Sequence, residues 1–314
     1  MNRYIKFPIA TSNHDESNNE LKEPRLLAIS VDVEEGETVT FDSYKKSDGI
    51  RKSEYGDYNE KKGTYERAIK YDKGIMAEHI LASASVPEHY DYTLVPKEYD
   101  YTMTQEEKSI DIQNNDLKYS RFWDGGVLSN TPLRELIQAH QDYWTEVENK
   151  AKTSKNIPDL EVYIIDVWPS VDGYLVPSDL DGIRDRKDDL TYQDMTPYDE
   201  KVANIVSDYF DFVSKLEELA VEAIHGIGDA EKRHDLQTRL QGVYSTKAKS
   251  RHRTGELRTY HDLVNERFDI TKVIRIERSA DRDDIANKWC DFSLGTISNL
   301  FTQGTQDASR TLKT

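Results

Sequence analysis

The tripeptide Asp124-Gly125-Gly126 has the residue types and spacing in this chain that are best suited to chemistry. It contains the only pair of adjacent glycines, and a helix pattern with Pro132 in its first turn follows it. Glycine tolerates positive φ angles and lets other backbone approach closely, so the pattern places a carboxylate on a sharp turn. The same freedom of the glycines lets a substrate approach the carboxylate closely. A tight turn whose aspartate binds its own backbone is the alternative, and the tripeptide taken alone favours it.

Two further motifs surround the tripeptide in a fixed order. Residues 82–87 read Ala-Ser-Ala-Ser-Val-Pro at the end of a helical pattern, and residues 130–132 read Asn-Thr-Pro. The strings GIMAEHILASASVP at 74–87 and FWDGGVLSNTPL at 122–133 resemble the patatin-like phospholipase family. In that family, a helix ending in A-x-S-A-x-P leads by a loop to a D-G-[GA] turn and an Asn-Pro helix start. The resemblance extends over most of residues 7–305.

The resemblance implies a lipid acyl hydrolase that works through a serine–aspartate dyad. In the family, a serine in a G-x-S-x-G elbow attacks the ester, and the aspartate of D-G-G takes its proton without an intervening histidine. A glycine-rich loop upstream supplies the N–H groups of the oxyanion hole. Carried over to this chain, Asp124 is the catalytic proton acceptor, and Gly125 and Gly126 shape its turn. The resemblance implies a lipid or acyl-ester substrate, with no cofactor and no metal.

The nucleophile half of this dyad is missing from the chain. No serine has a glycine two positions before it, and no glycine-rich loop precedes the strand pattern that begins at Arg25. We therefore expect the C-terminal portion of a patatin-like hydrolase, shortened by a gene truncation, a split gene or a start-site error. A complementing N-terminal polypeptide is then an expected partner. The alternative is a catalytically inactive remnant or an interaction module.

Other residues that could do chemistry are expected to be structural. Cys290, the only cysteine, falls on an amphipathic helix pattern without a nearby histidine, which is typical of a buried thiol. Ser83 and Ser85 are expected to cap and pack a helix end. The eight histidines, such as His79 and His140, lack metal-ligand spacing such as H-E-x-x-H, and we expect single surface or core side chains.

Residues 179–182, Asp-Leu-Asp-Gly, resemble part of a calcium-binding loop. Pro177 stands where the first ligand belongs, however, and its side chain cannot coordinate an ion. The expectation is an acidic loop, and weak calcium binding is the alternative.

Two strand patterns separated by helices must position the Asp124 turn. Residues 25–33 and 160–167 are apolar runs that suit strands covered on both faces. A helix pattern at 74–85 stops before Pro87, because the residue before a proline is pushed out of the helical region. This alternation predicts a three-layer α/β/α fold with a largely parallel sheet. The resemblance implies the same fold, patatin-like and incomplete at its N-terminus.

The C-terminal part is expected to be mostly helical. Residues 198–224 carry an apolar stripe at helical spacing. We expect this stripe to pack on the protein's own core, and packing against a partner helix is the alternative. A closing helix is predicted at 281–308. The stripe consists of Val202, Ile205, Val206, Tyr209, Phe212, Val213, Leu216, Leu219 and Ala223. We thus expect a polar segment at 1–23, the hydrolase portion at 24–175, and a helical region packing on it at 176–314.

Composition narrows the classes of partner and compartment. The chain has 59 acidic and 42 basic side chains, a formal net charge of −17, which disfavours nucleic acids and anionic membrane faces. No apolar stretch is long enough for a membrane span, and residues 1–20 lack the pattern of a secretory signal. A single cysteine excludes an internal disulfide. We expect a soluble cytoplasmic protein that makes transient contact with membrane surfaces.

Overall fold

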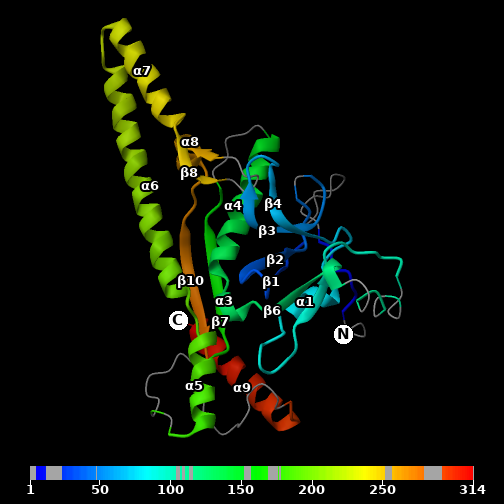
Figure 1. Cartoon of the computed structure of the whole chain (residues 1–314). Helices are drawn as coiled ribbons and strands as arrows, with labels where there is room; N and C mark the ends of the chain where they lie inside the picture. The colour runs from blue at the N-terminus through cyan, green and yellow to red at the C-terminus, as the bar shows by residue number, and fades with distance from the viewer. Residues whose placement is uncertain are drawn as a thin grey trace. The chain divides into compact units, whose positions relative to one another are not determined.

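The computed structural model is a mixed α/β protein that separates into two compact units (Figure 1). The first unit comprises Met1–Pro132, Asp166–Asp194 and Glu277–Thr314, and the second comprises Leu133–Ile165 and Met195–Ile276. Cys290 and much of the predicted polar segment lie outside the described residues. The structure describes residues 5–11, 23–46, 48–103, 107, 110–112, 116–151, 157–168, 176, 178–251, 257–278 and 292–313.

A four-stranded sheet in the first unit carries the Asp124 turn. Its strand order is β2-β1-β6-β5, and each neighbouring pair is antiparallel. The strands are β1 (Leu27–Asp32), β2 (Glu37–Asp42), β5 (Thr93–Pro96) and β6 (Tyr119–Asp124). A largely parallel sheet was predicted, and for this sheet that prediction is wrong. The apolar run of β1 reflects its inner position and burial on both faces, which an inner antiparallel strand can also have.

The core of the first unit lies between this sheet and a short helix. Phe41 and Phe122 are fully buried and contact each other edge to face, with ring centroids 5.6 Å apart. Helix α1 (Ala77–Ala82) confirms the helix predicted before Pro87, although it is shorter than expected. The first unit also contains β3 (Lys52–Asn59), β4 (Thr64–Lys70), η1 (Asp116–Lys118), α3 (Gly126–Ser129), α5 (Leu180–Tyr192) and α9 (Leu294–Thr311).

Helix α5 replaces the acidic loop that was predicted around residues 179–182. Asp179 is its N-cap, and the Oδ1 atom of this side chain accepts a hydrogen bond from the Gly182 backbone N–H at 2.8 Å. Aspartate is favoured at this position because it binds an N–H group that the helix itself leaves unpaired. The short acidic sequence is therefore the start of a helix.

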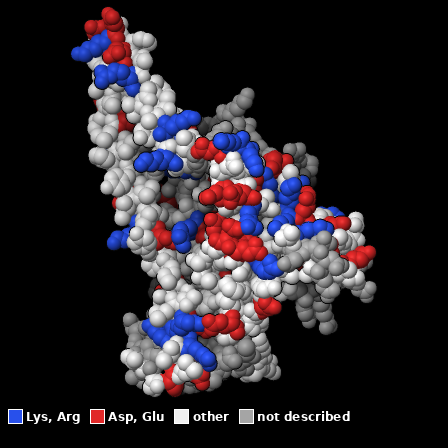
Figure 2. Space-filling view, in the orientation of Figure 1, with Lys and Arg blue, Asp and Glu red and all other residues white. Residues whose placement is uncertain are grey.

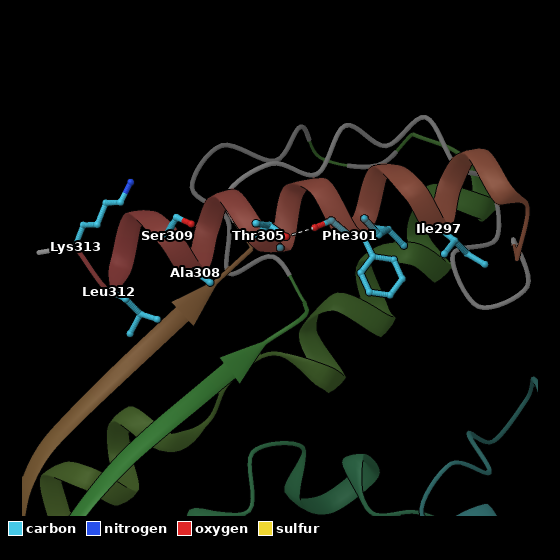
Figure 3. A pocket seen from close by; sticks show the side chains of 9 residues that line it. Ile297, Phe301, Thr305, Ala308, Ser309, Leu312 and Lys313 are labelled. Carbon is cyan, nitrogen blue, oxygen red and sulfur yellow. Dashed lines mark hydrogen bonds between the residues drawn. The ribbon is translucent and has the colours of Figure 1, made fainter. Parts of the chain in front are cut away.

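The second unit combines helices with a pair of strands. Its elements are α4 (Leu133–Ala151), β7 (Leu160–Asp166), α6 (Thr196–His225), α7 (Ala230–Tyr244), β8 (Lys247–Arg251), β9 (Leu257–Thr259), α8 (Tyr260–Asn265) and β10 (Ile270–Glu277). Strands β7 and β10 pair, and their arrows run in the same direction in Figure 3. Leu133, Val162 and Ile164 form the buried centre of this unit. No helix in the described part of the chain is long and apolar enough to cross a membrane.

Helix α6 and helix α7 form a long hairpin (Figure 1). The apolar stripe of α6 was expected to pack on the core of the protein, and that prediction is wrong. Tyr209 is 67% exposed and Leu219 is 62% exposed. Between Ala203 and Ile224, the less exposed residues of α6 lie on another face, and four of these seven have small side chains: Ala203, Ser207, Phe210, Ser214, Glu217, Ala220 and Ile224. Small side chains let a helix approach its neighbours closely, and this leaves the large side chains facing outward.

Candidate functional site

Asp124 is the last residue of β6, at the point where the sheet ends. It lies opposite Ser30 of β1 in the antiparallel register. Its backbone N–H donates a hydrogen bond to the carbonyl oxygen of Ser85 at 2.9 Å. Strand pairing and this additional bond fix the backbone from which the carboxylate projects.

Gly125 is required by a close approach of two backbone segments. A Cβ atom added to Gly125 would lie 2.4 Å from the carbonyl oxygen of Ile29, which is far inside van der Waals contact. The backbone of Gly125 is helical, with φ −60° and ψ −27°, so a positive φ angle is not the reason for glycine here. Of the two reasons for glycine that the sequence suggests, the structure supports only the close approach.

The Asp124 carboxylate is held by the turn that follows it. Its Oδ1 atom accepts a hydrogen bond from the Gly126 backbone N–H at 2.6 Å. Burial raises the pKa of the Asp124 carboxyl above its ordinary value, and the bond from Gly126 opposes part of this rise. A half-buried carboxylate with a raised pKa is a stronger base than an exposed one, so this group is suited to accept a proton.

The three sequence motifs meet at this turn. Ser85, from the motif at 82–87, provides the carbonyl oxygen that accepts the Asp124 N–H. In the motif at 130–132, the Asn130 side-chain amide donates to the carbonyl oxygen of Tyr192. The next residue, Thr131, donates from its hydroxyl to Asp194 Oδ1 at 2.6 Å. The first and third motifs therefore anchor the two ends of the segment that carries Asp124.

Tyr192, at the end of α5, forms an aromatic wall beside the turn. Its ring carbon Cδ1 would lie 3.2 Å from a Cβ atom added to Gly126. The ring stacks on Trp168, with centroids 5.5 Å apart and an interplanar angle of 26°. Burial and the nearby Asp124 charge raise the pKa of the Tyr192 hydroxyl to about 12. Sequence reasoning missed this residue because it is far from Asp124 in the chain.

Ser30 is a second neighbour of Asp124 that sequence reasoning missed. Residues directly opposite each other in an antiparallel pair have side chains on the same face of the sheet. Ser30 is fully buried, and its hydroxyl has no hydrogen-bond partner among the described residues. A substrate cannot reach a fully buried hydroxyl, so Ser30 is not a nucleophile in this conformation. Strand register alone identifies it, and register cannot be read from a local motif.

Asp166, at the end of β7, is another buried carboxylate of the first unit. It is 2% exposed, and its Oδ1 atom accepts a hydrogen bond from the Trp168 backbone N–H at 3.0 Å. Burial raises the pKa of Asp166, and the charges of Asp194 and Glu277 add to the rise. The described residues contain no group of three His, Cys, Asp or Glu side chains that could hold a metal ion. Asp166 is thus a candidate proton-holding group that sequence reasoning did not single out.

The remaining serine and histidine candidates have structural partners. The Ser85 hydroxyl donates to the carbonyl oxygen of Leu81 at 2.8 Å and lies 2.7 Å from the Thr93 hydroxyl, which confirms its expected packing role. His79 is fully buried and accepts the Met76 backbone N–H at 2.9 Å. Burial lowers the pKa of His79 to about 3, so it is a neutral core histidine, as predicted.

A shallow apolar groove of about 830 Å³ runs along helix α9 (Figure 3). Figure 3 shows Ile297, Phe301 and Leu312 directed to one side of this helix. No carboxylate is among the described residues that line it. The groove has the character of a surface for apolar groups, and it offers no group suited to proton transfer.

The Asp124 turn is therefore the place in the described structure where a raised-pKa carboxylate, a crowded glycine turn and an aromatic wall come together. Among the described residues, no accessible serine is hydrogen-bonded to the Asp124 carboxylate. The turn therefore has a carboxylate suited to accept a proton and no described serine positioned to give it one. Comparison of the chain with models of protein families, with curated proteins and with solved structures finds no match.

Proposed function

We propose that this chain carries the carboxylate half of a serine–aspartate acyl hydrolase of the patatin-like type. The complete site would cleave ester bonds of phospholipids or neutral lipids. The observation that carries the proposal is the convergence of the three motifs on the Asp124 turn, through the carbonyl oxygen of Ser85 and the side chains of Asn130 and Thr131. An order of motifs along a sequence has functional weight only if the motifs also meet in space.

Asp124 acts in this proposal as the proton acceptor. The serine Oγ attacks the carbonyl carbon of the ester, its proton passes to the Asp124 carboxylate, and the carbonyl π bond opens to an oxyanion. When the oxyanion collapses, the ester C–O bond breaks and the departing alcohol takes the proton from Asp124. Water then hydrolyses the acyl-serine by the same sequence of steps. The raised pKa of Asp124 makes the carboxylate a better base, and Gly126 holds it in place through the bond to Oδ1. The serine and the oxyanion-hole N–H groups come from a complementing polypeptide segment.

The test is ester hydrolysis by the chain mixed with the polypeptide encoded immediately upstream. We expect hydrolysis of short p-nitrophenyl esters that falls by about 10²–10⁴-fold in Asp124→Asn, since that is the usual contribution of a general base. Asp42→Asn is the matched control, because it neutralises another buried carboxylate of the same unit, at the end of β2, and should retain activity. Full activity in Asp124→Asn, or no activity in the mixture, would contradict the proposal.

The location and partners belong to the same proposal. The single cysteine supports a reducing, cytoplasmic compartment, and a lipid substrate would require transient contact with membrane surfaces. Repulsion by the net charge of −17 favours neutral over anionic lipid surfaces.

A second candidate function is an interaction module without activity of its own. The exposed apolar stripe on α6 favours it, since large apolar side chains in a helical row are unusual on a surface without a partner. The two functions concern different units of the protein and are compatible.

A further inference from the structure

Helix α6 has a heptad pattern along its exposed face. Its 30 residues make it about 45 Å long. Apolar residues recur along it at alternating spacings of four and three, which is the seven-residue repeat of a coiled coil. The seam residues are Tyr198, Val202, Ile205, Tyr209, Phe212, Leu216, Leu219 and Ala223. A repeat kept over this length is the sequence pattern of a helix that pairs along its whole seam with another helix.

The seam is open to solvent throughout. Exposure ranges from 42% for Val202 to 73% for Tyr198, with Phe212 at 57% in the centre. Figure 2 shows much of α6 without charged side chains on the viewed face. Contiguous apolar surface of this kind marks an interaction site, because burying it releases water from a large area.

The two flanks of the seam differ in a way that selects the partner. One flank begins with Asp199, which forms an ion pair with Arg134, and continues with the apolar residues Val206, Val213 and Ala220. The other flank carries charges of alternating sign at seven-residue intervals: Lys201, Asp208, Lys215 and Glu222. None of these four side chains forms an ion pair with a residue that the structure describes. When a second copy of this flank runs in the opposite direction, each charge lies beside a charge of opposite sign.

We propose that the α6 helices of two copies of this chain associate as an antiparallel coiled coil. In the symmetric register, Tyr209 packs against the partner's Phe212 at the centre. On either side of this centre, Ile205 packs against the partner's Leu216. The charged flanks then meet each other, with Lys201 beside the partner's Glu222.

Charge complementarity sets the antiparallel direction. In a parallel pair, each charged flank would face the partner's apolar flank, so Asp208 and Lys215 would lose water without gaining a partner. In the antiparallel pair, Asp208 lies beside the partner's Lys215 and Val206 lies beside the partner's Val213. The apolar residues of one flank thus face apolar residues of the partner. On the other flank, each of the four charges gains an opposite charge from the partner.

The seam is large enough for a stable dimer. It is roughly 40 Å long, and half the circumference of a helix is roughly 17 Å, so each copy buries on the order of 700 Å². A standard protein interface buries about 800 Å² per partner. This assembly goes beyond the proposed hydrolase activity and does not depend on it.

The decisive experiment is sedimentation velocity of the full chain over a wide range of concentrations. We expect a reversible dimer, and we expect Phe212→Glu to weaken it by about a hundredfold or more, since that residue lies at the centre of the interface. Val243→Glu is the matched control, because this α7 side chain is also exposed, at 56%, and lies outside the seam. A monomeric wild-type chain, or a dimer that Phe212→Glu leaves intact, overturns the proposal.

Charge reversal tests the direction without touching the apolar seam. The single changes Lys201→Glu and Glu222→Lys each place like charges together and should weaken the dimer severalfold. The double variant restores both opposite-charge pairs in the antiparallel register and should recover wild-type association. A double variant that is as weak as the singles overturns the antiparallel assignment, and this outcome remains readable if Phe212→Glu fails to fold.

Discussion

The Asp124 turn and helix α6 invert the usual relation between residue type and burial. At the turn, polar and small residues are enclosed, and their hydrogen bonds are made within the first unit. Along α6, aromatic and aliphatic side chains such as Tyr209 and Phe212 face water. The hydrogen bonds of the turn are satisfied, and under the proposed function it lacks only the serine that would donate a proton to Asp124. Helix α6 is regular, but nothing in the described structure covers its apolar face.

The proposed function and the proposed assembly therefore require different tests, one of the reaction and one of association. A missing nucleophile affects the reaction and leaves folding unchanged. A missing helix partner affects assembly and leaves the turn unchanged. Substitutions matched between the two regions can therefore separate the chemical account from the assembly account.

Truncating one phenylalanine in each region should give the largest contrast. Phe122 is fully buried beside Phe41, whereas Phe212 is 57% exposed. We expect Phe122→Ala to lower the free energy of unfolding by about 3–5 kcal/mol, because it leaves a cavity in the core. Phe212→Ala should change it by less than about 0.5 kcal/mol in the monomer. Urea unfolding at low protein concentration measures both, and equal losses would show that α6 is buried in solution.

A glycine pair gives the next contrast. Gly125→Ala forces a Cβ atom against the Ile29 carbonyl oxygen, and we expect a loss of about 1–3 kcal/mol in the free energy of unfolding. Gly242, in helix α7, has nothing within 4 Å of an added Cβ atom, so Gly242→Ala should gain up to about 1 kcal/mol. Thermal unfolding of the two variants checks this. A neutral Gly125→Ala would mean that β1 and the turn are not in close contact.

Local sequence patterns predicted the strand, helix and turn around Asp124 better than they predicted which residues lie next to them in space. The strand at 25–33, the helix before Pro87 and the turn at Asp124 follow from short-range rules, and the structure confirms them as elements. Strand direction, the position of Ser30 opposite Asp124, and the wall formed by Tyr192 depend on which distant segments pair. No local periodicity contains that information.

The error at α6 has a different physical origin. Periodicity identifies the apolar face of a helix, but it does not identify what covers that face. Packing on the protein's own core was expected because it is the usual outcome for such a stripe. The proposed helical partner rests on the spacing of four and three, together with the alternating charges at Lys201, Asp208, Lys215 and Glu222.

The smallest expected effect is on the pH dependence of stability. Burial raises the pKa of Asp124 in the folded protein, so its contribution to stability is fully present below its unfolded pKa and is lost as pH rises through its folded pKa. Asp124→Asn removes this titration. The stability of the wild type relative to Asp124→Asn should therefore fall as pH rises from the acidic range toward neutrality. Urea unfolding at several pH values measures it, and a rise instead would contradict the pKa shift.

The most direct test of the account is ester hydrolysis by the complemented protein carrying either Asp124→Asn or Phe212→Glu. We expect Asp124→Asn to abolish most of the hydrolysis while sedimentation still detects the dimer. We expect Phe212→Glu to disperse the dimer while its hydrolysis per chain stays close to that of the wild type. Hydrolysis that survives Asp124→Asn would contradict the central claim that the Asp124 carboxylate accepts the proton of the nucleophile.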